Sequence, residues 1–74
     1  MTITIYTSHG CGPCMATKDW LNKQGHAYTE KDVSQHAEYA TELRSLGYRV
    51  TPVIMVGDEA VVGFNTIRLK ELLS

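Results

Sequence analysis

The stretch Thr2-Ile-Thr-Ile-Tyr-Thr-Ser-His-Gly-Cys-Gly-Pro-Cys14 decides how this chain folds. Its first half is β-rich and alternates polar with apolar side chains as far as Tyr6, which is typical of a strand. Ser8 and two glycines then interrupt that pattern, and Pro13 suits the first turn of a helix because its missing N–H would be unpaired there. The stretch predicts a strand, a loop and a helix, with two cysteines where the helix begins.

The first helix is expected over residues 13–24, because Gly25 suits the left-handed conformation that ends many helices. Within it, Trp20 and Leu21 are expected to pack in the core. Residues 26–32 alternate weakly and end in charged side chains, which indicates an edge strand. The strand, helix and second strand predict two parallel strands joined by a right-handed crossover.

A second helix is expected next, with Asp32 or Ser34 as its N-cap and Gly47 as its stop. Its apolar side chains recur at the helical spacing i, i+4 and i+7: Tyr39, Leu43 and Leu46. A loop follows, and Thr51-Pro52 stands directly before the next β-rich run. Proline is tolerated at such a strand start because it cannot donate to the ladder.

The last third of the chain predicts a hairpin and a helix. Residues 53–56 and 59–62 are β-rich runs separated by Gly57-Asp58, a two-residue turn signal, so they are expected to pair antiparallel. Asn65 suits the N-cap of the final helix. The apolar face of that helix is predicted from Ile67, Leu69, Leu72 and Leu73. The expected fold is one α/β domain over residues 1–74 in the order βαβαββα, with a four-stranded mixed sheet and three helices.

Composition and charge exclude several classes of protein. The 74 residues suffice for about one small domain, and 43% hydrophobic with 20% charged residues is ordinary for a globular protein. The net charge is −1 without a block of one sign, so neither nucleic acid nor a membrane is an expected partner. The first residues show no basic segment followed by an apolar stretch, so we expect a cytoplasmic protein. We also expect a monomer.

The spacing Cys11-Gly12-Pro13-Cys14 is compatible with a structural cross-link, half of a metal site or a redox pair. In a reducing compartment, a lone pair of cysteines favours metal or redox chemistry over a cross-link. Its position at a strand-to-helix junction favours redox chemistry, because the free N–H groups and the positive dipole end of the helix stabilise a thiolate. The nucleophilic thiol of such pairs commonly has a pKa of about 3.5 to 7.5.

These observations predict a dithiol that exchanges with disulfides. Cys11 is the predicted nucleophile, and Cys14, about one turn inside the helix, is predicted to be more buried and to resolve the mixed disulfide. Gly12 lets a partner's backbone approach closely. Pro13 removes an amide donor, which we expect to weaken thiolate stabilisation and favour a reducing pair.

Two other residues are predicted as modulators of the thiols, although a solvated side chain is the simpler interpretation of each. They are His9, two residues before the first cysteine, and Lys18, four residues after the second. No metal site is expected, because the chain lacks the set of ligands that a closed zinc site needs. The rival hypothesis is a Cu(I)-binding metallochaperone, which also uses a Cys-x-x-Cys pair. The βαβαββα order, and His9 where that class has a methionine, favour the redox pair.

Three stretches carry a resemblance to a known family: Cys11-Gly-Pro-Cys-Met-Ala-Thr-Lys18, Leu46-Gly-Tyr-Arg-Val-Thr-Pro-Val-Ile54 and Val62-Gly-Phe-Asn65. In order and spacing they resemble the glutaredoxin-like, NrdH-type redoxins of the thioredoxin superfamily. The Gly-Pro pair between the cysteines is similar to that of thioredoxin. The resemblance implies a thioredoxin-like fold and protein-disulfide reductase activity.

The resemblance also implies roles for residues beyond the cysteines. Pro52 would be a cis-proline beside them, Val50 and Thr51 would pair antiparallel with an incoming peptide, and Gly63 and Phe64 would line the same groove. No bound cofactor is implied. Electrons would come ultimately from NADPH through a thioredoxin-reductase-like flavoenzyme and pass to a disulfide-containing protein such as ribonucleotide reductase. The residues with which classical glutaredoxins bind glutathione are absent in that form, so weak or absent glutathione binding is expected. The electron donor stays open between thioredoxin reductase and glutathione.

Overall fold

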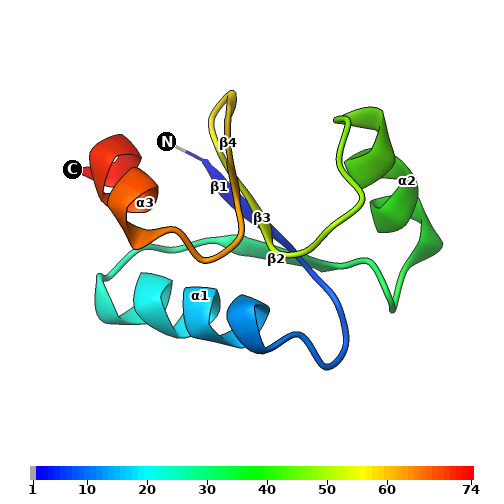
Figure 1. Ribbon diagram of the computed structural model, residues 1–74, viewed down its shortest axis with the longest axis horizontal. Helices are drawn as coiled ribbons and strands as arrows, with labels where there is room; N and C mark the ends of the chain where they lie inside the picture. Colours follow the sequence, from blue (N-terminus) through cyan, green and yellow to red (C-terminus); the bar gives the residue numbers. More distant parts are fainter. Residues whose placement is uncertain (1) are drawn as a thin grey trace.

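The computed structural model describes residues 2–74 and contains one mixed sheet and three helices (Figure 1). The elements are β1 (Ile3–Thr7), α1 (Gly12–Lys23), β2 (Thr29–Asp32), α2 (Ala37–Ser45), β3 (Val53–Val56), β4 (Glu59–Val62) and α3 (Thr66–Leu73). The strand order is β2-β1-β3-β4, with β1 parallel to β2 and the other two pairs antiparallel. The predicted order and sheet are confirmed. None of the described helices is long and apolar enough to cross a membrane.

The sheet buries side chains on both faces, because successive strand residues point to opposite sides. One face packs against α1 and α3 through Leu21 and Leu69, both fully buried. That cluster consists of Ile3, Ile5, Leu21, Ile54, Val56, Val61 and Leu69, with Trp20 packed against it. On the other face Tyr6 and Val53 meet Leu43 of α2. Figure 1 accordingly shows α2 at the opposite end of the molecule from α3.

The turn and cap signals are confirmed where they depend on adjacent residues. Gly25 and Gly47 follow α1 and α2 with φ of 77° and 96°, the left-handed region in which glycine is favoured. The side chain of Asn65 caps α3 by accepting a hydrogen bond of 3.1 Å from the Arg68 N–H. The β3–β4 hairpin turns at Gly57-Asp58, with Val56 and Glu59 paired.

The start of α2 differs from its prediction, which placed the N-cap at Asp32 or Ser34. β2 runs through Asp32, whose Oδ1 accepts hydrogen bonds from the backbone N–H and the hydroxyl of Ser34, at 2.9 and 2.5 Å. These residues form a turn of their own, and a carboxylate used in that way does not cap a helix. α2 begins only after His36, whose side chain makes no capping hydrogen bond.

Two side chains that were predicted to lie on the apolar faces of their helices are instead exposed. Ile67 is 76% exposed and Leu46 is 43% exposed. Both lie near a helix end, and their helices bury only Leu69 and Leu43 fully. β2 is also shorter than the predicted 26–32, and α1 is shifted by one residue from 13–24.

Candidate active site

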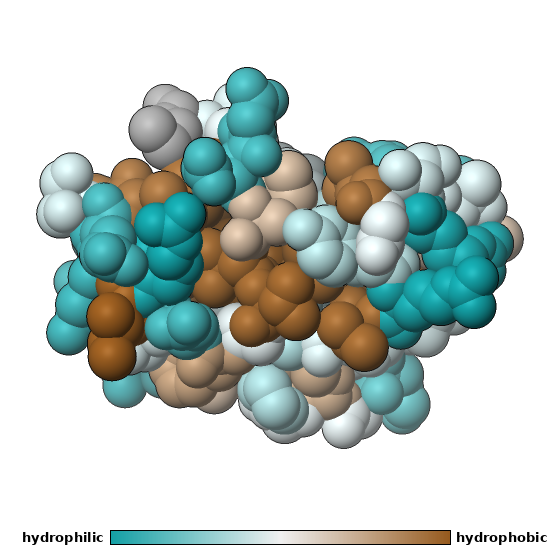
Figure 2. Space-filling view, turned by 45° about the horizontal axis from the view of Figure 1, so that its top comes forward, coloured by the Kyte–Doolittle hydropathy of each residue, from teal (hydrophilic) through white to brown (hydrophobic). Residues whose placement is uncertain are grey.

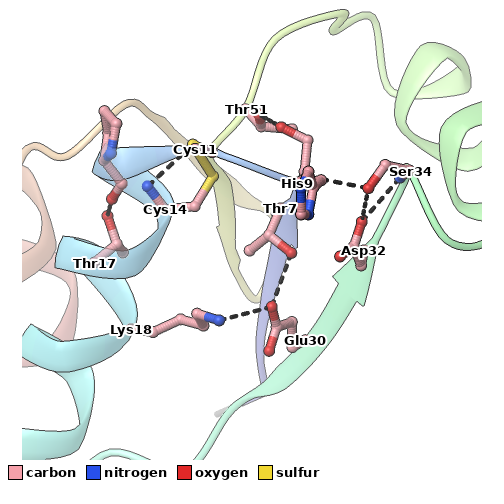
Figure 3. Close-up of a disulfide and its surroundings, with 12 residues drawn as sticks. Thr7, His9, Cys11, Cys14, Thr17, Lys18, Glu30, Asp32, Ser34 and Thr51 are labelled. Atoms are coloured by element: carbon pink, nitrogen blue, oxygen red, sulfur yellow. Dashed lines mark hydrogen bonds and ion pairs between the residues drawn. A yellow bond between two sulfur atoms is a disulfide. The ribbon is translucent and has the colours of Figure 1, made fainter.

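The two cysteines lie where the loop after β1 meets α1, and they form a disulfide (Figure 3). Cys11 is the N-cap of α1, and its Sγ accepts a hydrogen bond of 3.1 Å from the Cys14 N–H. Pro13, in the first helical turn, offers no N–H of its own. The Cys11 sulfur therefore has one backbone donor at the positive end of the helix dipole, where a thiolate is stabilised.

The two cysteines differ in burial. Cys14 is 1% exposed, and Cys11 is half-buried. Gly12 and Pro13 between them are exposed, as is Met15, which follows. A partner can therefore approach from the side of Cys11, while Cys14 stays covered beneath it.

The loop before β3 lies against the loop that carries Cys11. The hydroxyl oxygens of Ser8 and Thr51 are 2.6 Å apart in a hydrogen bond, and the Thr51–Pro52 peptide bond is cis, as the resemblance implied. The Gly63 N–H donates to the Pro52 carbonyl at 2.9 Å. These two contacts bring the end of β4, the proline loop and the cysteine loop together.

The predicted groove residues differ in exposure. Pro52 is buried, Thr51 and Gly63 are half-buried, and Val50 and Phe64 are exposed apolar side chains. Figure 2 shows apolar side chains gathered over the middle of one face of the molecule, with strongly hydrophilic ones over the end formed by α2. An exposed apolar area of this kind favours contact with another protein.

His9, one of the two predicted modulators, is exposed and tied to the turn after β2. Its backbone N–H donates to the Ser34 hydroxyl oxygen at 3.0 Å. That hydroxyl in turn donates to Asp32, and this hydrogen bond lowers the pKa of Asp32 below its usual value. The backbone of His9 thus helps to hold the cysteine loop, and within residues 2–74 no hydrogen bond joins its ring to either sulfur.

Lys18, the other predicted modulator, is paired with a carboxylate. Its Nζ lies 3.0 Å from Glu30 Oε2, which also accepts a hydrogen bond of 2.9 Å from the buried Thr7 hydroxyl. Figure 3 shows Lys18 turned toward Glu30. Thr17, fully buried in α1, donates to the Pro13 carbonyl at 2.8 Å and so fixes the first turn of that helix.

A further polar cluster joins α2 to the sheet. Glu42 accepts hydrogen bonds of 2.5 Å from both the Tyr6 hydroxyl and the Lys31 ammonium group. Burial, the hydrogen bond and the charge of Glu42 raise the pKa of Tyr6 to about 12. The hydrogen bonds from Lys31 and Tyr6 lower the pKa of Glu42. Because all three residues hold α2 against β1 and β2, we assign this cluster a structural role.

No arrangement of three or more His, Cys, Asp or Glu side chains suited to a metal ion occurs among residues 2–74. The copper-chaperone hypothesis gains no support from the fold either, since the element order is βαβαββα. A mixed sheet with a cysteine pair at the start of α1 and a cis-proline facing its loop defines the thioredoxin-fold class of dithiol proteins.

Comparison with known proteins narrows this class. The glutaredoxin family model matches residues 3–61. The glutaredoxin-like protein NrdH of Salmonella typhimurium is 36% identical over 72 residues, covering 97% of this chain and 89% of that protein. The chain belongs to the glutaredoxin family, as one of its NrdH-type glutaredoxin-like redoxins. It is therefore a thiol-disulfide oxidoreductase.

Two solved structures agree with this assignment. The glutaredoxin-like NrdH-redoxin from Escherichia coli superposes with a TM-score of 0.89 at 35% identity, over 100% of this chain and 97% of that one. The thioredoxin-like protein BC3987 superposes with a TM-score of 0.91 at 33% identity, over 97% and 100%. The predicted thioredoxin-like fold is confirmed.

Three residues at this site were not predicted from the sequence. Ser8 and Ser34 hold the cysteine loop on two sides, and Glu30 pairs with Lys18 beneath it. Ser8 is one of the residues that interrupt the first strand pattern, and Ser34 follows Asp32 at the spacing of an Asx turn. Neither local signal indicates the distant partner. Their partners across the loop lie 43 and 25 residues away.

Proposed function

We propose that this oxidoreductase reduces disulfide bonds of other proteins, with Cys11 as the attacking thiol and Cys14 as the resolving thiol. The difference in burial between the two cysteines is the observation that supports this order. A half-buried sulfur at a helix N-terminus is accessible and favoured as a thiolate, whereas a sulfur covered by its neighbours reacts only within the molecule.

The reaction is a two-step exchange. The Cys11 thiolate attacks one substrate sulfur, the substrate disulfide breaks, and the second substrate sulfur leaves as a thiolate that takes a proton from water. The Cys14 thiol, after losing its proton, attacks Cys11, releases the first substrate sulfur as a thiol and forms the Cys11–Cys14 disulfide. The substrate gains two electrons and two protons, and the protein loses them.

The substrate backbone is proposed to pair antiparallel with Val50 and Thr51, beside Pro52. Val50 and Phe64 are exposed and the Thr51 hydroxyl is held by Ser8, which supports this placement. Gly63 presents no side chain at the wall of this groove, and its N–H is already bonded to the Pro52 carbonyl. A main-chain pairing of this kind accepts many sequences, since backbone hydrogen bonds supply affinity and side-chain pockets supply specificity.

Reducing equivalents are proposed to come from NADPH through a thioredoxin-reductase-like flavoenzyme, and no bound cofactor is required. The solved Escherichia coli relative is described as having a thioredoxin-like activity profile, which supports this donor over glutathione. The sequence also lacks the glutathione-binding residues of classical glutaredoxins in their usual form. Ribonucleotide reductase is proposed among the protein substrates because of the NrdH-type relatives.

Reduction of insulin disulfides coupled to NADPH tests this proposal. The oxidised protein is incubated with NADPH and thioredoxin reductase, or with NADPH, glutathione and glutathione reductase. We expect turnover in the first system and little in the second. Turnover in neither system would contradict the reductase assignment, and faster turnover with glutathione would contradict the proposed donor.

A further inference from the structure

A hollow of about 190 Å³ opens between the end of β2, α2 and the loop that leads to β3. Its lining is Val33, Ala40, Leu43, Arg44, Tyr48 and Arg49. Leu43 is buried and Val33, Ala40 and Tyr48 are half-buried, so the floor is largely apolar, whereas Arg44 and Arg49 are exposed. The hollow therefore combines an apolar base with two guanidinium groups at its surface.

The topology places this hollow at the same end of the strands as the disulfide. β1 ends at Thr7, four residues before Cys11, and β2 runs parallel to it and ends just before Val33. β3 runs antiparallel to β1, so it begins at that same end, and the loop that contains Arg49 leads directly into it. Arg49 is also only two residues from Thr51, whose hydroxyl is bonded to the cysteine loop.

Among residues 2–74, three basic residues have no carboxylate at ion-pair distance: Arg44, Arg49 and Lys70. Of these three, only the two arginines line the hollow. Four of the seven basic residues form ion pairs with carboxylates: Lys18, Lys23, Lys31 and Arg68. Within residues 2–74, Arg44 and Arg49 have no carboxylate at ion-pair distance, and Arg44 contacts only the Thr41 hydroxyl, at 3.4 Å. A planar guanidinium matches a carboxylate with two parallel hydrogen bonds, and two of them beside an apolar floor favour an acidic side chain with its methylene stem.

We propose that this hollow is a subsite for an acidic residue, aspartate or glutamate, of the protein substrate. The inference rests on the proposed function and on antiparallel pairing of the substrate with residues 50–52. In that pairing the attacked cysteine lies near Pro52, and the residues that follow it lie opposite Thr51, Val50 and Arg49 in turn. The acidic residue is therefore two to four positions after the attacked cysteine, and the subsite selects among disulfide-bearing segments.

Peptides with a single cysteine in a disulfide with 2-nitro-5-thiobenzoate test the subsite. Because the nitrothiobenzoate thiolate is the better leaving group, Cys11 attacks the peptide sulfur and releases the coloured thiolate. Three peptides of equal length are compared: one with Glu at the third position after the cysteine, one with Gln there, and one with Glu at the third position before the cysteine and Gln after it. The second-order rate constant with the pre-reduced protein is measured by stopped flow.

We expect the peptide with Glu after the cysteine to react about three- to fivefold faster than the other two at low salt, which is the upper part of the range for exposed charge pairs and suits a carboxylate that faces two arginines. The Arg49→Gln and Arg44→Gln variants should each reduce this preference, and Arg49→Lys should retain part of it. Lys70→Gln on α3 removes the same charge elsewhere and should leave the preference unchanged. Salt should weaken the preference, because the pairs are exposed.

Equal rates for the three peptides with the wild-type protein would overturn the subsite. An equal loss of preference in Lys70→Gln and Arg49→Gln would also overturn it, because the effect would then come from net charge alone. Faster reaction of the peptide with Glu before the cysteine would overturn the proposed direction of pairing and the subsite with it. Failure of the protein to react with any peptide would instead refute the proposed function.

Discussion

At the scale of single residues, the unequal burial of the two cysteines predicts unequal behaviour of their serine variants. Cys14→Ser leaves an accessible nucleophile without a resolving thiol, so it should accumulate a mixed disulfide with an oxidised peptide at close to one equivalent. Cys11→Ser retains only a thiol that is 1% exposed and should accumulate almost none. Intact mass under non-reducing conditions measures both, and dithiothreitol should release the adduct. Trapping by Cys11→Ser but not by Cys14→Ser would reverse the assigned roles.

Pro13 determines how many backbone donors reach the Cys11 sulfur. The N–H of Cys14 donates to it, while Pro13, one position earlier in the first turn, has no N–H to donate. Pro13→His restores that donor, which stabilises the thiolate and so the reduced form. We expect a less negative redox potential, measured by equilibration with glutathione redox buffers.

A matched control for this variant is Met15→Ala, at an exposed position next to the pair that changes no backbone donor. Its potential should equal that of the wild-type protein. An unchanged or more negative potential for Pro13→His would contradict the assigned effect of the proline.

At the scale of elements, the contact between β1 and α2 predicts an alkaline loss of stability. The folded state holds the proton of Tyr6 up to a pKa of about 12, because of burial and the Glu42 carboxylate, whereas an unfolded tyrosine loses its proton near pH 10. The stabilisation is complete below about pH 10 and is lost as pH rises toward 12. Between pH 9 and 11 the loss of unfolding free energy due to this group is about 1 kcal/mol.

The Tyr6→Phe variant isolates that contribution, since it keeps the buried ring and removes the titrating hydroxyl. Urea unfolding at pH 9 and pH 11 gives the free energy of each form. The wild-type protein should lose about 1 kcal/mol more than Tyr6→Phe between these two pH values. Parallel losses in the two proteins would show that Tyr6 does not couple the sheet to α2.

Turns and caps that depend only on neighbouring residues were predictable from the sequence. A helix start was not predictable where one side chain can either cap the helix or form a turn. The hairpin turn at Gly57-Asp58 and the Asn65 cap need only local geometry, and both predictions are confirmed. The predicted start of α2 is wrong because the Asp32 carboxylate bonds Ser34 in a turn. Aspartate suits both a helix N-cap and a turn of this kind, and the sequence does not show which backbone N–H its carboxylate binds.

At the scale of the whole molecule, the cysteine pair was predictable because strand, loop and helix are contiguous, but its surroundings were not. The Ser8–Thr51 hydrogen bond joins residues 43 positions apart. The arginine hollow likewise joins the end of β2 to the loop before β3. Such contacts form only after the sheet has brought the end of β1 beside the start of β3. The family resemblance predicts the proline loop, whereas no local pattern in the sequence indicates either contact.

The packing of α3 on the sheet predicts how this helix contributes to stability. Leu69 is fully buried against β1, β3 and α1, whereas Ile67, two residues earlier on the same helix, is 76% exposed. Leu69→Ala removes buried methyl groups and leaves a cavity, which costs about 2 to 5 kcal/mol. A chain of this length has a total stability of about 4 to 11 kcal/mol, so the variant should unfold at a much lower urea concentration.

Ile67→Ala is the matched control, because it removes a similar side chain from the same helix without opening a cavity, and its free energy of unfolding should change by less than about 0.5 kcal/mol. Urea unfolding followed by circular dichroism measures both variants. Similar losses in the two would mean that α3 is held by its own helical propensity and not by the core. A large loss confined to Leu69→Ala would show that this helix closes the face of the sheet opposite α2, and that the core of so small a protein depends on its last helix.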